Sequence, residues 1–341
     1  MPKSSILLAG VGAALLWVAG TAAADGLTIE QVLGDLNLPA DAAARIRRGE
    51  MVHSGPRESS DRELAVGLTY LVQQPLAEVL KAFRAGVDLK ADRELAVSIP
   101  IRGPGMLADF ATLVVEPEGQ AEARRYLAAR PGDDLNLSPD EISAFEALPS
   151  TGNLKAPVEE QLKRLLLSRY QAYRAKGLAG MAPYARRSGL CEPANELRRM
   201  SEAARLLKIH APALQQVLLS YPERKPAGLE EHFFWLRYEL DGRPNYTLRH
   251  RMALQVGETY AVADRDFYVS HGYNVSQSFA GLIPVPEGTM VVFRDRVSTD
   301  QVAGLGSSVK KGIGRGMMAE HLIAIFQRSR DSSGGTEGRS P

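Results

Sequence analysis

The sequence predicts an α+β protein built on an antiparallel sheet, with a long helix at its C-terminal end. From Leu229 onward the spacing of apolar residues changes from the period of about 3.6 typical of helices to the period of two typical of strands. Five such runs follow one another across short gaps that contain glycine or proline. Short gaps connect antiparallel neighbours, because parallel strands need a long crossover.

Before Leu229 the pattern predicts one strand followed by a mostly helical region. Alternating apolar residues over 63–72 predict a strand, and Pro75 opens a helix whose apolar residues recur at helical spacing. Residues 87–228 contain several further helical patterns, and we expect no sheet of their own there. The five strands and the closing helix are expected at 230–240, 246–255, 259–269, 272–283, 289–298 and 308–328.

The two ends of the chain carry different patterns. Lys3 precedes an uncharged run over 6–20, and small residues fill 21–24. This run is shorter than the roughly 20 residues that span a bilayer, so residues 1–24 predict a cleavable secretory signal peptide. An uncleaved membrane anchor is the alternative. We expect a periplasmic or secreted mature chain, cut at about Ala24, that does not span a membrane, and a disordered tail over 331–341.

The overall composition excludes some classes of partner. Lys and Arg number 41 against 40 Asp and Glu, so there is no basic field to attract nucleic acid. Cys191 is the single cysteine and cannot form an internal disulfide. An exported chain of this kind must be stabilised by its apolar core.

The order of one strand, a helix opened by proline, an antiparallel meander and a closing helix resembles the helix-grip fold of the START and Bet v 1-like (SRPBCC) superfamily. Residues 71–80 look like that superfamily's first strand and first helix, and 291–326 look like its last strand, loop and final helix. The resemblance implies a domain over 25–330 whose sheet wraps around the C-terminal helix and leaves a cavity between them. Residues 87–228 are then a large helical insertion. More loosely, the chain resembles exported bacterial proteins of no assigned function.

Two neighbouring strands carry the residues expected to line that cavity. In 246–255 the apolar residues share one face and the arginines point the other way, which predicts one buried face and one wet face. Met, Tyr and His among aliphatic residues suit a bulky apolar ligand. An ordinary filled core beneath the helix is the alternative. The candidate ligand-binding residues are His232, Phe234, Tyr238, Tyr246, His250 and Met252.

The role of His250 distinguishes the hypothesis of a carrier from that of an enzyme. A buried imidazole near the phenol of Tyr246 could transfer protons or bind a ligand hydroxyl, although a hydrogen-bonded core histidine is the commoner case. At about 3.3 Å per residue along a strand, their Cα atoms lie about 13 Å apart, too far for a catalytic pair. We therefore predict no catalytic residue.

Other motifs are incomplete. None of the six histidines lies two to four residues from another histidine or cysteine, so no zinc site is expected. The calcium-like series that begins at Asp134 has Pro139 where glycine is required. The glycines of 304–316 do not fit a phosphate loop and indicate close packing of the closing helix. The overlapping S-x-x-K matches over 307–311 have no partner motif and are better explained by a helix start.

These observations lead to one functional prediction with two alternatives. We expect an exported binding protein that holds a hydrophobic small molecule or lipid between the sheet and the C-terminal helix, with no cofactor. A cyclase- or hydrolase-like enzyme on the same fold is the first alternative. A structural or partner-binding envelope protein with a filled core is the second.

Overall fold

The computed structural model describes residues 28–34, 36, 38–115, 120–132, 135–304 and 306–334. The predicted signal peptide at 1–24, Asp134 and residues 335–341 of the predicted tail lie outside these ranges. Residues 331–334, which were expected to belong to the tail, continue the closing helix.

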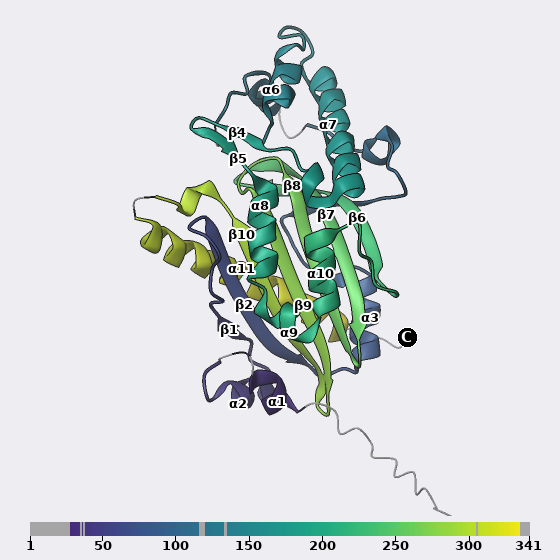
Figure 1. Ribbon diagram of the computed structural model, residues 1–341, viewed down its shortest axis with the longest axis vertical. Helices are drawn as coiled ribbons and strands as arrows, with labels where there is room; N and C mark the ends of the chain where they lie inside the picture. Colours follow the sequence, from purple (N-terminus) through teal and green to yellow (C-terminus); the bar gives the residue numbers. More distant parts are fainter. Residues whose placement is uncertain are drawn as a thin grey trace, which may run out of the picture.

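An open antiparallel sheet of eight strands organises the described chain (Figure 1). Its strand order is β1-β2-β10-β9-β8-β7-β6-β3, so the first long strand pairs with the last one and the short strands β1 and β3 form the edges. The strands predicted from the period of two are confirmed, although β9 begins three residues later than expected. The strands are β1 (Val52–Ser54), β2 (Glu63–Val72), β3 (Leu95–Ile101), β6 (Glu230–Leu240), β7 (Arg243–Val256), β8 (Thr259–Val269), β9 (Val275–Val285) and β10 (Gly288–Ser298).

Helices cover both faces of this sheet. The helices α7, α8 and α10 lie on one face and are here called the insertion layer, because they come from the region predicted as an insertion (Figure 1). The helices α3, α4 and α11 lie on the opposite face and are here called the closing layer. The helices are α1 (Ile29–Gly34), α2 (Ala42–Arg47), α3 (Leu76–Arg84), α4 (Val87–Lys90), α5 (Ala121–Leu127), α6 (Pro139–Glu146), α7 (Lys155–Lys176), α8 (Pro193–Glu202), α9 (Arg205–His210), α10 (Pro212–Ser220) and α11 (Ser307–Gly334), with short 3-10 turns at Leu107–Phe110, Gly177–Gly180 and Asp300–Val302.

The expectation of one wet face is therefore wrong. Residues on both faces of β7 are buried, including Arg251, which is 6% exposed. The apolar face of β7 packs against the insertion layer in the largest core cluster. Its arginine-bearing face is shielded by the closing layer, which a period-2 pattern alone cannot reveal.

The region 87–228 also contributes strands, against expectation. β3 pairs with β6 at the edge of the main sheet, and β4 (Tyr184–Arg186) pairs with β5 (Gly189–Cys191) in a small separate hairpin. The edge position of β3 suits Pro100, because proline has no N–H to donate to a second neighbour. β3 is short and proline-containing, so its strand pattern is weak in the sequence.

A fully buried arginine joins the insertion layer to the sheet. Arg265 of β8 has no exposed surface, and its Nε and Nη2 atoms donate to Oε1 of Gln277 on β9 at 2.9 and 2.7 Å. Nη2 also donates to the Ser201 hydroxyl of α8 at 3.1 Å and to the Leu218 carbonyl of α10 at 2.8 Å. Among the described residues no carboxylate forms an ion pair with Arg265. Its charge is balanced by polar groups that the helices bring to it.

Replacing Arg265 with methionine should strongly destabilise the fold. Methionine fills similar space but does not donate to the side-chain oxygen of Gln277 or to the hydroxyl of Ser201. Each buried polar group left unpaired costs about 1–3 kcal/mol. We expect the free energy of unfolding to fall by at least about 3 kcal/mol in urea denaturation. The control Lys208→Met changes an exposed residue of α9 and should stay within about 0.5 kcal/mol. A loss below about 1 kcal/mol in Arg265→Met would contradict this anchoring role.

Candidate functional site

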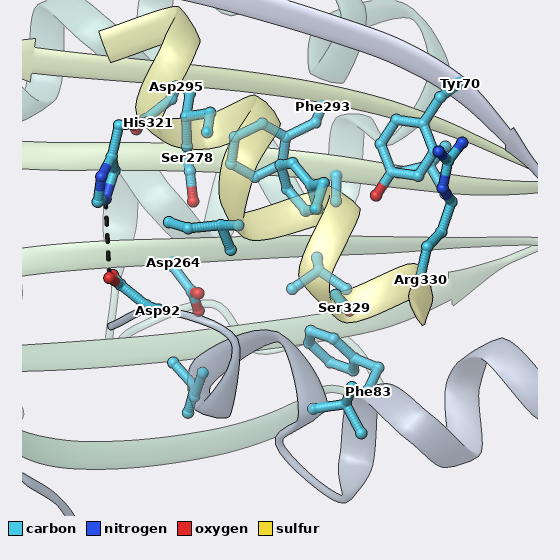
Figure 2. A pocket seen from close by; sticks show the side chains of 18 of the residues that line it. Tyr70, Phe83, Asp92, Asp264, Ser278, Phe293, Asp295, His321, Ser329 and Arg330 are labelled. Carbon is cyan, nitrogen blue, oxygen red and sulfur yellow. Dashed lines mark ion pairs between the residues drawn. The ribbon is translucent and has the colours of Figure 1, made fainter. Parts of the chain in front are cut away.

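A cavity of about 920 Å³ lies between the sheet and the closing layer (Figure 2). This volume falls within the range of about 300–1,000 Å³ typical of small-molecule sites. Residues from α3, α4, α11 and the strands β2 and β6 to β10 line it. The region between α11 and the sheet is therefore only partly filled: Leu322 packs on Val66 and Leu68, and the cavity lies beside this cluster.

Helix α11 turns one stripe of side chains toward this cavity. The stripe follows helical spacing, and its members are Met318, His321, Leu322, Ile325, Phe326, Ser329 and Arg330. The ring of Phe326 lies 5.3 Å from that of Tyr70 on β2 and 4.9 Å from that of Phe293 on β10, measured between centroids. These rings and Phe83 of α3 form an aromatic part of the wall (Figure 2).

The strands β7 and β8 give the cavity a charged floor. Arg249 donates to both carboxylate oxygens of Asp266 at 2.6 and 3.0 Å, and Arg251 donates to both of Asp264 at 2.8 and 2.6 Å. The hydroxyls of Ser276 and Tyr273 also donate to Asp266, at 2.8 and 3.1 Å. Within each bidentate pair the arginine and the aspartate neutralise each other's charge, and the paired hydrogen bonds hold the four side chains in fixed positions.

Asp295 of β10 is, in the described part of the chain, a cavity carboxyl without an arginine partner. Among the described residues it forms no ion pair, and one of its oxygens accepts a hydrogen bond from the backbone N–H of Arg296 at 3.0 Å. Burial, and then the nearby negative charge of Asp266, raise the pKa of Asp295 to about 7. Near neutral pH this carboxyl therefore exists in both protonation states and can either donate or accept a hydrogen bond.

A cluster of one histidine and two carboxylates forms another part of the cavity wall. His321 of α11 lies 3.7 Å from Asp92 (Nε2 to Oδ1) and 3.7 Å from Glu94 (Nδ1 to Oε1), two residues of the segment that joins α4 to β3 (Figure 2 shows the contact with Asp92). Contact with the carboxylate of Asp92 raises the pKa of His321. This contact connects the closing helix to the edge of the sheet.

The six candidate ligand-binding residues do not come together in the cavity. Tyr238 lines it, whereas His232 is exposed and borders a separate polar hollow beside Lys225. Phe234 is half-buried on the same side of β6 as Tyr238. The placement under α11 is wrong for Tyr246, His250 and Met252, which are fully buried on the opposite face, against the insertion layer.

His250 belongs to a buried polar chain rather than to a cavity. Its Nδ1 atom lies 3.1 Å from the hydroxyl of Tyr173 on α7, and its Nε2 atom lies 3.3 Å from Glu231 Oε1 on the neighbouring strand. Its ring stacks on Phe233 at 4.1 Å between centroids. Burial lowers the pKa of His250 to about 4, against the opposing effect of Glu231, so the imidazole is neutral at pH 7.

The nearby carboxylate of Glu231 could not be assigned to His250 from the sequence, because the register of β6 on β7 was unknown. Burial acts to raise the pKa of Glu231, but its contacts with His250 and Lys225 lower it to about 2. The phenol of Tyr246 lies elsewhere and donates to the Val114 carbonyl at 2.7 Å. A catalytic pair of His250 and Tyr246 therefore has no support in the geometry.

The polar residues of the cavity were missed because their pattern is that of a solvated surface. Arg249, Arg251, Asp264 and Asp266 alternate with apolar residues along β7 and β8, as charged residues do on any exposed strand face. One feature of the sequence could have indicated a buried polar site: two neighbouring strands of the predicted meander carry several charged residues of both signs on one face.

No protein-family model, no curated protein and no solved structure matches this chain. Within the described residues, every helix is too short or too polar to cross a membrane.

Cys191 is buried, and burial raises the pKa of its thiol to about 11, so it stays protonated and unreactive at neutral pH.

Replacing Asp295 with asparagine should stabilise the protein at alkaline pH and not at acidic pH. Because its folded pKa of about 7 lies above the usual 3.8, ionisation favours the unfolded chain. The penalty is absent below about pH 4, grows between pH 4 and 7, and is complete above pH 7. We expect Asp295→Asn to add about 1–2 kcal/mol at pH 8, a value reduced for the partial exposure of the carboxyl.

The measurement is urea unfolding at pH 4 and pH 8, with Asp61→Asn as the control at an exposed carboxylate. The control should change stability equally little at both values of pH. If Asp295→Asn gives the same small change at both, the carboxyl has an ordinary pKa and the description of the site is wrong.

Replacing His250 with leucine should cost about 2–4 kcal/mol of stability, because it removes the hydrogen bond with the buried Tyr173 hydroxyl and the ring stacked on Phe233. Thermal and urea unfolding measure this loss. His232→Leu, at an exposed histidine of the adjacent strand, is the control and should stay within about 0.5 kcal/mol. A neutral effect of His250→Leu would show that the buried chain contributes no net stability.

Proposed function

We propose that this chain is an exported binding protein that holds a hydrophobic small molecule or lipid between its sheet and its C-terminal helix, in a START-like helix-grip arrangement. The cavity of about 920 Å³ between α11 and the sheet carries the proposal. It occupies the position at which that superfamily resemblance implies a ligand. A structural protein with a filled core would have no use for a space of this size, because cores pack with few voids larger than a water molecule.

The wall of the cavity favours an amphipathic ligand. Its aromatic part, with Tyr70, Phe83 and Phe326, offers apolar contact, while Asp295 and Ser278 lie toward the polar floor (Figure 2). The Arg249–Asp266 and Arg251–Asp264 pairs are already matched, so a ligand gains little from breaking either of them. The proposed ligand therefore has an apolar body and one polar group, such as a hydroxyl, amide or amine, that meets Asp295.

An acid–base enzyme on the same fold is the second candidate. It is favoured by one observation, a cavity carboxyl whose pKa of about 7 suits proton transfer near neutral pH. In that case Asp295, and not His250, is the proton-transferring group. Turnover of a bound molecule that is abolished by Asp295→Asn with binding retained would favour the enzyme over the carrier.

Two adjacent methionines of α11 provide a matched test of the cavity. Met318 points into the cavity, whereas Met317 is 67% exposed on the outer side of the helix. Met318→Trp should fill part of the cavity and weaken binding of Nile red, an uncharged apolar dye, by at least about tenfold, which corresponds to 1.4 kcal/mol. Met317→Trp should bind the dye as the unchanged protein does.

Dye fluorescence titration measures both variants, and circular dichroism checks that they fold. Equal dye binding by the two variants would place the binding surface elsewhere and overturn the proposal. The same titration competed with lipid extracted from the native envelope, with mass spectrometry of the bound fraction, would identify the natural ligand.

A further inference from the structure

The cluster of Asp92, Glu94 and His321 has the composition of a metal site. One potential ligand atom from each residue can be chosen so that all three lie within 4.8 Å of one another. Asp92 is further fixed in place because its Oδ1 atom accepts the backbone N–H of Glu94 at 3.0 Å. The residues come from two segments more than two hundred positions apart, and all three line the cavity.

A bound metal would draw the three ligand atoms closer together than they now lie. Zinc bonds to imidazole nitrogen and carboxylate oxygen at about 2.0–2.2 Å, which in tetrahedral geometry places ligand atoms about 3.4 Å apart. The two contacts of 3.7 Å use different imidazole nitrogens, Nε2 toward Asp92 and Nδ1 toward Glu94, and a metal bonds to only one of them. With one ligand atom from each residue, the three atoms lie within 4.8 Å of one another. His321 and Glu94 are partly exposed, with side chains 37% and 47% accessible, so both have room to rotate toward a shared metal.

The charge and donor type select the class of metal. Two carboxylates with a neutral imidazole carry two negative charges, which match a divalent cation. A mixed nitrogen and oxygen set favours zinc and its neighbours over magnesium or calcium, which prefer oxygen alone. Three protein ligands also leave one coordination position open, as in zinc sites that bind a water or a substrate group.

We propose that Asp92, Glu94 and His321 bind a divalent transition metal, zinc by its donor set, at the wall of the cavity. The metal joins α11 to the segment between α4 and β3 and presents its open position toward the cavity. An anionic or neutral donor group of a cavity ligand can complete the coordination there. The site itself requires no particular ligand, so it stands or falls independently of the proposed function.

Isothermal titration of the mature chain with zinc chloride tests the site. We expect one equivalent to bind, and we expect His321→Gln and Asp92→Asn each to weaken binding by at least about tenfold. His53→Gln, at an exposed histidine of the edge strand β1, is the matched control and should bind zinc unchanged. Magnesium chloride should give no comparable binding.

Thermal unfolding supplies an independent readout of the bridge. At a free zinc concentration about 100 times the dissociation constant, the unfolding temperature of the parent protein should rise by about 5 °C, and that of both site variants should not. The two variants are checked for folding by circular dichroism before titration. Failure of the parent to bind zinc below about 1 mM, or zinc binding by both variants equal to the parent, would overturn the proposal and leave His321 as an ion-pair partner of the two carboxylates.

Discussion

The structure depends on the fully buried cation of Arg265, which fixes what each face of the sheet does. Because Arg265 points into the insertion layer and gathers α8, α10 and the side chain of Gln277 around its guanidinium, the strand alternation sends Asp264 and Asp266 to the other face. Three consecutive charged residues are thus divided between a structural anchor and a cavity floor. A buried charge held only by hydrogen bonds is costly, so the helices that supply those bonds cannot leave without exposing it.

The opposite face carries two ion pairs that line the cavity. Replacing a buried ion pair by apolar residues is often neutral or stabilising. The pairs Arg249–Asp266 and Arg251–Asp264 are therefore not expected to add much to the stability of the fold. They form a rigid polar floor of the cavity, in which each arginine is neutralised by its own aspartate. Asp295 then stands out, since its destabilising ionisation is tolerated at a position that faces open space, and perturbed carboxyls of this kind gather at functional sites.

Much of the fold was readable from the sequence, and little of the site was. The strands from β6 to β10 and the helix α11 follow from a clean change of period, which depends only on local spacing. Which face of β7 meets the cavity depends on where the insertion layer docks, and no local pattern records that. His250 shows the consequence, because its carboxylate partner Glu231 and its burial both arise from register and docking. The contact between His321 and Asp92 joins distant segments and is equally invisible in the sequence.

The way α11 is attached bears on how a ligand would reach the cavity. Polar contacts hold the helix near its two ends: Lys311 and Arg315 meet Glu58 at 2.8 and 3.1 Å, and Arg328 donates to the Ala91 carbonyl at 2.7 Å. Between these ends its inward stripe both lines the cavity and packs on the sheet, where Leu322 contacts the cluster of Val66 and Leu68, so lifting the helix would forfeit apolar contacts as well. The contact of His321 with Asp92 lies within this middle stretch. Moving α11 away from the sheet would therefore have to break this contact together with the apolar contacts of the same stretch.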